Sequence, residues 1–272
     1  MSKTVLITGA SSGFGLATAK LFQEHGWNVM ATMRTPDKGA DLARLPGVLV
    51  AAADVVDRPS IAAAVAAATE RFGGIDVLVN NAGYGTLGVL EAATEAEINK
   101  QFDVNVFGLM AVTQAVLPVM RRQRAGTLIN ISSVGGRLAF PYFSLYHATK
   151  FAVEGLSESL QYELAPLGIR VKLVEPGGYK TNFAGSSLGF FGVEGLEDYR
   201  AGFDRFLQTM AQGAGQNENI AEVAAKIYEA ATDPTDRLRY PVGADALQLL
   251  EAQRTLGEVP FHRMLVQQMG LV

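Results

Sequence analysis

Short runs rich in β-branched residues alternate with longer helical patterns along almost the whole chain. The runs expected to form strands are 4–8, 27–32, 48–53, 76–79, 127–132, 170–175 and 238–241. Helical patterns lie between them, near 13–25, 57–72, 94–122, 144–167 and 219–232. Strands that alternate with helices form right-handed crossovers and a parallel sheet covered on both faces. The alternation therefore predicts one doubly wound α/β domain over 1–272.

The composition excludes several classes of protein. Apolar residues make up 49% of the 272 and charged residues 18%, which indicates a large core rather than disorder. The net charge of −4, with no basic block, argues against nucleic acid as a partner. The chain has no cysteine and therefore no disulfide, thiolate metal site or cysteine nucleophile. His25, His147 and His262 lie too far apart to suggest a metal site.

The N-terminus leads at once into the first predicted strand, without the apolar stretch of a signal peptide. No stretch approaches the roughly 18 consecutive apolar residues of a membrane span. We therefore expect a soluble, cytoplasmic protein without a membrane partner.

A glycine-rich turn follows the first predicted strand. It reads Thr8-Gly9-Ala10-Ser11-Ser12-Gly13-Phe14-Gly15 and leads into a helical pattern. Glycines let the backbone approach a pyrophosphate, and the helix N-terminus behind them offers free N–H groups and a positive dipole end. At this place in a parallel sheet, the pattern predicts that a dinucleotide binds Gly9, Ser11, Ser12, Gly13, Phe14 and Gly15. The spacing Gly-x3-Gly-x-Gly is wider than in other dinucleotide folds.

Together with four further motifs, this spacing resembles the short-chain dehydrogenase/reductase family from about Thr4 to Val242. The motifs are Asp54-Val55, Asn80-Asn81-Ala82-Gly83, Asp103-Val104-Asn105-Val106-Phe107-Gly108, and Pro176-Gly177-Gly178 with Thr181. The resemblance implies a Rossmann-type, seven-stranded parallel sheet in the order 3-2-1-4-5-6-7. It implies a cofactor site that includes Asp54, Val55, Asn81, Ala82, Gly83, Pro176, Gly177, Gly178 and Thr181. Asn105 corresponds to the active-site asparagine of the family.

A tyrosine and a lysine stand four residues apart in Tyr146-His147-Ala148-Thr149-Lys150, near the start of a predicted helix. Such residues share a helix face, so the Lys150 ammonium can lie near the Tyr146 phenol. A phenol with a pKa of about 10 is a poor base at neutral pH, and an adjacent cation favours the phenolate. The pair is a candidate acid/base unit that also contacts the cofactor. By resemblance, Ser133 is the catalytic serine and Asn105 positions a water that relays protons to Lys150.

The implied reaction is reversible hydride transfer between a nicotinamide cofactor and an apolar ketone or secondary alcohol. Tyr146 would exchange a proton with the substrate oxygen, and Ser133 would hold that oxygen. Three alternatives stay open: an NAD-dependent alcohol dehydrogenase of the same family, a non-redox lyase or epimerase, and a dinucleotide-sensing protein on the same fold. A sensing protein usually loses the catalytic residues, and the epimerases usually carry a longer C-terminal domain than the tail near 243–272.

Residues 179–206 break the alternation because they combine seven aromatic residues with interspersed glycines. An insertion near 179–212 is typical of a lid over a site, although packing on the core or on a second subunit also explains it. The candidate substrate contacts are mostly apolar: Ser133, Val134, Phe140, Phe143, Tyr146, Tyr179, Phe183, Phe190 and Phe191. They include no cluster of basic residues, which favours an apolar substrate over a phosphate or carboxylate.

The residues after the second predicted strand bear on cofactor choice. An NAD site places an acidic residue about 20 residues after the glycine turn. Here the strand ends Ala31-Thr32-Met33-Arg34-Thr35, with no acidic residue before Asp37. Arg34 offers a planar charged fork suited to a phosphate, and Ser11 and Ser12 add hydroxyl donors. Unless Arg34 is a solvated loop residue, the sequence predicts NADP(H) rather than NAD(H).

Two predicted helices, 104–120 within the longer pattern and 144–167, are apolar on more faces than one sheet can cover. Members of the family commonly pair these helices across a two-fold axis. The resemblance therefore implies a homodimer or a homotetramer.

Overall fold

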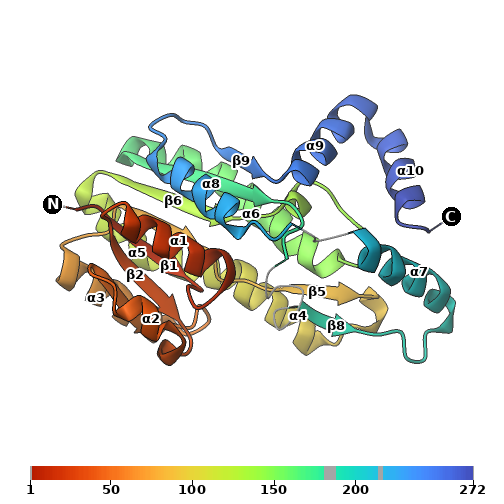
Figure 1. The fold of residues 1–272 in the computed structure, drawn as a ribbon, viewed down its shortest axis with the longest axis horizontal. Helices are drawn as coiled ribbons and strands as arrows, with labels where there is room; N and C mark the ends of the chain where they lie inside the picture. Colours follow the sequence, from red (N-terminus) through yellow and green to blue (C-terminus); the bar gives the residue numbers. More distant parts are fainter. Residues whose placement is uncertain (1, 181–187, 214–216, 272) are drawn as a thin grey trace.

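The computed structural model describes residues 2–180, 188–213 and 217–271. Within them, seven strands form one parallel sheet in the order β3-β2-β1-β4-β6-β7-β9 (Figure 1). The strands are β1 (Thr4–Thr8), β2 (Asn28–Met33), β3 (Val48–Ala52), β4 (Val77–Asn80), β6 (Gly126–Ile131), β7 (Ile169–Pro176) and β9 (Arg239–Val242). Numbered along the chain, this is the predicted order 3-2-1-4-5-6-7, so the predicted doubly wound fold is confirmed.

Helices cover both faces of the sheet. On one face lie α1 (Gly13–Glu24), α8 (Ile220–Thr232) and the short α2 (Ala40–Ala43), packed on side chains such as Val5 and Ile7. On the other lie α3 (Arg58–Phe72), α5 (Leu109–Gln123) and α6 (Ser144–Leu164), packed on side chains such as Leu6. Successive side chains of β1 thus pack into the hydrophobic cores on opposite faces of the sheet, because side chains along a strand alternate between the two faces. A strand buried on both faces must be apolar throughout, which explains the apolar runs.

The predicted helix 94–122 is divided in the structure. A helix α4 (Glu95–Phe102), which begins with a Thr94–Glu97 capping box, runs into a π-helical segment (Asp103–Gly108) and then into α5. The wider turn of the π-helical segment directs Asn105 toward the interior, and this residue is only 3% exposed. Such segments are frequent at functional sites.

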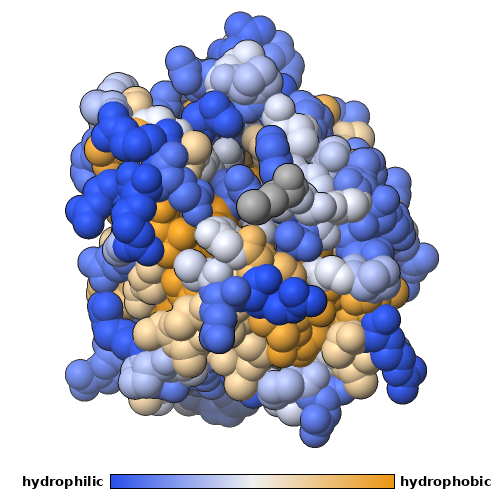
Figure 2. Space-filling view, turned by 90° about the vertical axis from the view of Figure 1, so that its left-hand side faces the viewer, coloured by the Kyte–Doolittle hydropathy of each residue, from blue (hydrophilic) through white to orange (hydrophobic). Residues whose placement is uncertain are grey.

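The stretch Glu95–Gln123 is long and apolar enough to cross a membrane by length and composition alone, with a mean hydropathy of 1.5 in its most apolar window. Half of that window, 50%, is buried inside the protein, where α5 packs against α3 and the sheet. Buried core helices pass the same test. The space-filling view from the end that carries the N-terminus shows an apolar area in its lower part, bordered by polar and charged residues (Figure 2).

Several elements were not predicted. A second, two-stranded parallel sheet joins β5 (Gly85–Gly88) to β8 (Leu188–Phe191). The expected lid region also contains α7 (Glu197–Gly213), and the expected tail forms α9 (Ala244–Leu256) and α10 (Glu258–Gln268). These elements gather at the end of the molecule opposite the N-terminus (Figure 1). Single-turn 3₁₀ helices at Pro36–Gly39, Leu90–Ala92, Val134–Gly136 and Ala165–Leu167 complete the described elements.

Candidate active site

The glycine turn between β1 and α1 requires glycine at specific positions. Gly9 and Gly13 have φ angles of 68° and 54°, which other residues rarely adopt. A Cβ atom at Gly15 would lie 2.4 Å from the Gly9 carbonyl oxygen. The Ser12 side chain, at the start of α1, makes no capping hydrogen bond. The first N–H groups of α1 therefore have no side-chain cap from Ser12, which suits an anion.

Asn81 holds the glycine turn in place. Its Nδ2 donates hydrogen bonds to the carbonyl oxygens of Thr8 (2.9 Å) and Gly9 (3.2 Å). In return, Thr8 Oγ1 accepts from the backbone N–H groups of Asn81 and Ala82, both at 3.0 Å. The neighbouring Asn80 instead joins β4 to β6 by donating to Asn130 Oδ1 at 2.9 Å. The Asn80–Gly83 segment thus positions the predicted pyrophosphate site.

Ser133, Tyr146 and Lys150 come together where β6 ends and α6 begins. Ser133 Oγ accepts from the Gly135 N–H at 3.0 Å, and its hydroxyl hydrogen-bonds the Tyr146 side chain. Lys150 follows Tyr146 by one helical turn and lies with Nζ 5.7 Å from the centre of the Tyr146 ring. Lys150 Nζ also donates to the Ile131 carbonyl oxygen at 2.8 Å, which fixes the lysine against β6.

Burial governs the electrostatics of this group. Burial raises the pKa of Tyr146 to about 12, while the Ser133 hydrogen bond acts in the opposite direction. Burial lowers the pKa of Lys150 to about 8, and the nearby Glu154 carboxylate raises it. At neutral pH the phenol therefore carries its proton and the lysine its charge, as a proton donor beside a cation requires.

Asn105 has protein partners for its whole side-chain amide. Oδ1 accepts from the Tyr84 N–H at 3.0 Å, and Nδ2 donates to the Tyr84 carbonyl oxygen at 2.8 Å and to Thr149 Oγ1 at 3.1 Å. The amide thereby ties the loop after β4 to α6, next to Lys150. The role of Asn105 in a proton relay to Lys150, which the family resemblance implies, stays a prediction.

The segment after β7 lies beneath α9. The Gly177 N–H donates to the Val242 carbonyl oxygen at 3.0 Å, and the Gly178 N–H donates to Asp245 Oδ2 at 2.6 Å. A Cβ atom at Gly177 would lie 2.2 Å from Asp245 Oδ1, so a side chain here would have to displace the Asp245 carboxylate. The predicted contacts Thr181 and Phe183 lie outside the described residues.

The predicted adenosine contacts lie at the ends of β2 and β3. Met33 is 2% exposed and packs against Gly39, so Arg34 is the first exposed side chain after β2. Among the described residues, none forms a hydrogen bond or ion pair with the Arg34 guanidinium. Asp54 Oδ1 accepts from the Val56 N–H at 3.1 Å, and Val55 packs against Gly108 of the π-helical segment.

The predicted substrate wall is divided among three places. Val134 and Phe140 pack with apolar side chains of α9 and α10, including Phe261 and Leu265. The Phe143 ring lies 6.3 Å from that of Tyr146, centre to centre, and is the closest match to the prediction. Near them, the buried His147 accepts from the Phe140 N–H through Nδ1 at 3.2 Å, and burial lowers its pKa to about 4.

The other three described aromatic residues lie elsewhere. Phe190 is 55% exposed on β8, whereas Phe191 is buried against Gly88 of β5. Tyr179 belongs to the core beside α1 and α8: its ring meets Phe14 edge to face, and its hydroxyl donates to Glu222 at 2.8 Å. The structure therefore does not bring Tyr179 together with Val134, and this part of the predicted wall is corrected.

Sequence reasoning missed the contacts of Tyr142. This residue has a φ angle of 61°, its carbonyl oxygen accepts from the Gly88 N–H at 2.8 Å, and its ring packs on Phe203 and Phe206 of α7. Tyr142 thus joins the start of the catalytic helix to β5 and α7. The sequence analysis also did not predict α9 and α10, although apolar residues such as Phe261 and Leu265 recur in α10 at helical spacing.

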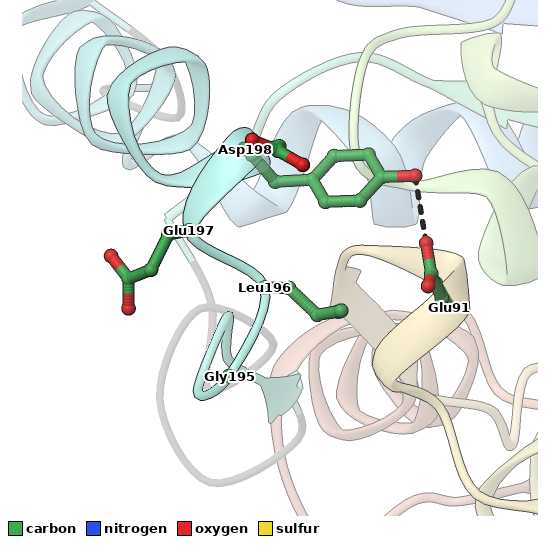
Figure 3. A pocket seen from close by; sticks show the side chains of 6 residues that line it. Glu91, Gly195, Leu196, Glu197 and Asp198 are labelled. Atoms are coloured by element: carbon green, nitrogen blue, oxygen red, sulfur yellow. Dashed lines mark hydrogen bonds between the residues drawn. The ribbon is translucent and has the colours of Figure 1, made fainter.

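A hollow of about 410 Å³ lies between the start of α7 and the 3₁₀ turn Leu90–Ala92 rather than at Tyr146 (Figure 3). Its lining consists of Glu91, Gly195, Leu196, Glu197, Asp198 and Tyr199. Tyr199 Oη donates to Glu91 Oε2 at 3.0 Å across it (Figure 3). None of the predicted site residues lines this hollow, and its charged residues are all acidic.

Comparison with known proteins identifies the family. The profile of the short chain dehydrogenase family matches residues 3–188. An uncharacterised oxidoreductase of Schizosaccharomyces pombe is 39% identical over 246 residues, which cover 88% of this chain and 100% of that protein. A 3-ketodihydrosphingosine reductase of Bacteroides thetaiotaomicron is 46% identical over 179 residues, which cover 66% of this chain and 65% of that protein.

Comparison with solved structures identifies the same family. A short-chain dehydrogenase from Streptomyces avermitilis matches with a TM-score of 0.80 and 37% identity over 94% of each chain. A 3-ketoacyl-(acyl-carrier-protein) reductase from Brucella melitensis with NADH has a TM-score of 0.73, 28% identity and coverage of 88% and 96%. An actinorhodin polyketide ketoreductase variant with NADPH has a TM-score of 0.75, 30% identity and coverage of 90% and 97%. The chain belongs to the short-chain dehydrogenase/reductase family and is an oxidoreductase that uses a nicotinamide dinucleotide.

Proposed function

We propose that this oxidoreductase reduces apolar ketones, or oxidises the matching secondary alcohols, with NADP(H) as its cofactor. The arrangement of Ser133, Tyr146 and Lys150 carries the proposal. A hydroxyl beside a buried, protonated phenol can hold and protonate one carbonyl oxygen. The whole chain acts in this proposal as a single dinucleotide-binding domain.

The glycine turn fits the pyrophosphate of a dinucleotide, since the N-terminus of α1 is not capped by Ser12 and Gly15 leaves no room for a side chain. We infer that the pyrophosphate binds the backbone from Ser11 to Gly15, and that Pro176–Gly178, Tyr146 and Lys150 hold the nicotinamide end. When bound, the cofactor supplies or accepts the hydride. The chain supplies orientation and the proton.

Tyr146 is the proton donor in the direction of reduction. Its raised pKa keeps the proton on the phenol at neutral pH, and the adjacent Lys150 ammonium stabilises the phenolate that remains after the transfer. The Ser133 hydroxyl donates to the same substrate oxygen as negative charge develops on it. In the oxidation direction the same groups act in reverse.

An apolar substrate is favoured by the side chains near Tyr146. Phe143, Val134 and Phe140 line this part of the chain, and α9 and α10 add further apolar residues behind them. Three matched proteins carry names that denote reduction of a ketone: the ketodihydrosphingosine reductase, the ketoacyl reductase and the polyketide ketoreductase. Both the residues and these names support a ketone with an extended apolar part.

NADP(H) is favoured over NAD(H) by Arg34. The side chain is exposed at the end of β2, makes no ion pair with described residues, and has no acidic residue beside it before Asp37. At this place a guanidinium without an ion pair to the described residues attracts a 2′-phosphate, and no acidic residue precedes Asp37 to repel that phosphate.

A panel of ketones tests the proposed function. Purified protein is mixed with NADPH or NADH and with aryl, steroidal or long-chain alkyl ketones, and cofactor absorbance is followed. We expect turnover of the apolar ketones with NADPH, at a kcat/KM at least about tenfold above that for charged keto acids. Keto acids as the better substrates, or equal efficiency with NADH, would overturn the substrate or cofactor assignment respectively.

We also propose that two copies of the chain associate in the cytoplasm. Phe107 of the π-helical segment, Phe151 and Tyr162 of α6 are 55%, 47% and 80% exposed. Phe151 and Tyr162 lie on one helix face, with the exposed Gly155 between them. Large exposed apolar side chains on paired helices favour a second copy as their cover.

A further inference from the structure

Two acidic residues are buried behind the catalytic lysine. Glu154 lies one helical turn after Lys150 on α6 and is 5% exposed, and Glu175, near the end of β7, is 0% exposed. The mechanism proposed above uses neither residue. Isolated buried carboxylates are costly, so their partners decide what they do.

One arginine bridges the two carboxyl groups. Arg239 of β9 places Nε 3.0 Å from Glu154 Oε2 and 3.2 Å from Glu175 Oε1. The same guanidinium also donates to Glu158, which is exposed on α6, and Arg137 lies 3.4 Å from Glu175 Oε1. Arg239 Nε therefore donates a hydrogen bond to Glu154 and forms an ion pair with Glu175, which accepts its hydrogen bond from Arg137.

The second oxygen of each carboxyl, Glu154 Oε1 and Glu175 Oε2, is buried and has no hydrogen-bond partner among the described residues. Two carboxylates around one nitrogen, each with an unpaired oxygen, repel one another in a medium of low polarity. A single proton kept between them removes one charge and supplies one O–H donor. Burial raises the pKa of both groups, that of Glu175 to about 7 with the neighbouring Glu154 contributing.

The position of the remaining negative charge matters to Lys150. The Glu154 carboxylate favours the charged lysine, which is otherwise disfavoured by burial. Gly136 lets the turn after β6 lie directly on this part of α6: a Cβ atom there would meet Ser132 Oγ at 2.6 Å and the Lys150 carbonyl oxygen at 3.2 Å. Ser132 Oγ is buried and, like Glu154 Oε1, has no hydrogen-bond partner among the described residues, and its hydroxyl favours the charged form of Glu154.

We propose that Glu154 and Glu175 share one proton, and that the division of the remaining negative charge between them sets the charge state of Lys150. Both are then positioning residues that act on Tyr146 through the lysine. The groups that face the pair are Lys150 and Glu158 on α6, Ser132 after β6, Arg137 after the turn Val134–Gly136, and Arg239 on β9. The inference rests on the proposed role of Lys150.

Two conservative variants test this assignment. Glu175→Gln leaves one carboxylate, placed wholly at Glu154 and close to Lys150. Glu154→Gln also leaves one carboxylate, but at Glu175, which is not among the groups that favour the charged form of Lys150. Both variants and the wild type hold the same net charge in the pair, so only its location differs. We expect the pKa of Lys150 to rise in Glu175→Gln and to fall in Glu154→Gln, each by about one pH unit.

Two readouts follow the lysine. The first is the alkaline limb of the kcat–pH profile, and the second is the pH dependence of Lys150 acylation in a short pulse, measured by mass spectrometry without cofactor. Because the second does not require turnover, it stays informative if the proposed function fails. Glu158→Gln is the matched control: it removes a carboxylate bonded to the same Arg239 but exposed, and should leave both readouts unchanged.

Ser132→Ala provides a second variant that keeps both carboxyl groups and the Arg239 bridge. It removes the hydroxyl that favours the charged form of Glu154, and it should therefore lower the pKa of Lys150, as Glu154→Gln does. Shifts of the two glutamine variants in the same direction, or no shift in either folded variant, would overturn the proposal. A purely structural role would lower the melting temperature without opposite shifts.

Discussion

At the scale of single residues, the proposed preference for NADP(H) depends on Arg34. This side chain is exposed at the end of β2 and forms no ion pair with the described residues. We predict that Arg34→Ala raises the KM for NADPH at least about tenfold, because charge-assisted hydrogen bonds to a phosphate are lost. The KM for NADH should change little. Lys38→Ala, an exposed basic residue on the next turn, is the control, and an equal loss with both cofactors would contradict the assignment.

His147 gives a pH dependence of stability whose sign follows from its environment. Burial lowers its pKa from 6.5 to about 4, so below pH 6.5 the unfolded chain binds a proton that the folded chain refuses. Stability is therefore full above pH 6.5 and falls as the pH drops toward 4, by on the order of 3 kcal/mol from this residue. In urea unfolding, the free energy of unfolding of His147→Asn should fall less between pH 6.5 and pH 4 than that of the wild type. Identical pH slopes for the two proteins would show that His147 is not a buried neutral histidine.

Part of the local geometry of the candidate cofactor site could be predicted, because the positive φ angles of the glycine turn and the one-turn spacing of Tyr146 and Lys150 are visible in the sequence. The bonds of Asn81 to Thr8 and Gly9 could not, because these residues lie 73 and 72 positions away along the chain. Tyr179 could not be placed, because its partners Phe14 and Glu222 are brought to it only by folding. The buried amide of Asn105 also depends on Tyr84, which no spacing rule connects to it.

At the scale of elements, the main sheet was predictable and the small sheet was not. Strands of the main sheet are buried on both faces and read as apolar runs, whereas β5 and β8 have four residues each and include glycines at Gly85, Gly88 and Gly189. Their pairing depends on space: a Cβ atom at Gly88 would lie 2.2 Å from the Phe191 carbonyl oxygen. No alternation of apolar and polar residues in the sequence predicts the pairing of β5 with β8.

Gly88→Ala should separate β8 from β5 and loosen the described part of the predicted lid region. We predict a rise of about tenfold in the KM for the ketone, with the KM for the cofactor nearly unchanged, since β8 lies far along the chain from the glycine turn. Hydrogen exchange of residues 188–191 should become faster. Gly189→Ala is the matched control because its Cβ atom would meet nothing closer than a Thr86 methyl group, at 3.1 Å. Equal effects of the two variants would refute the role of this pair.

At the scale of the whole molecule, the proposed association rests on the exposed apolar side chains of the π-helical segment and α6. We predict a dimer or tetramer in light scattering at micromolar concentration, and a monomer for Phe151→Glu, since a charge on this face opposes a second copy. Val259→Glu changes an apolar residue of α10 that is 58% exposed, against 47% for Phe151, and should leave the mass unchanged. A monomeric wild-type protein would contradict the assembly.

The central claim is that Tyr146 gives the proton to the substrate oxygen, and Tyr146→Phe tests it most directly. The phenyl ring keeps the packing against Phe143, so cofactor affinity measured by fluorescence titration should stay within about twofold of the wild-type value. The turnover number with a good ketone should fall at least about a hundredfold, as expected for loss of a general acid. A variant that binds cofactor normally and retains most of the wild-type turnover number would show that another group donates the proton.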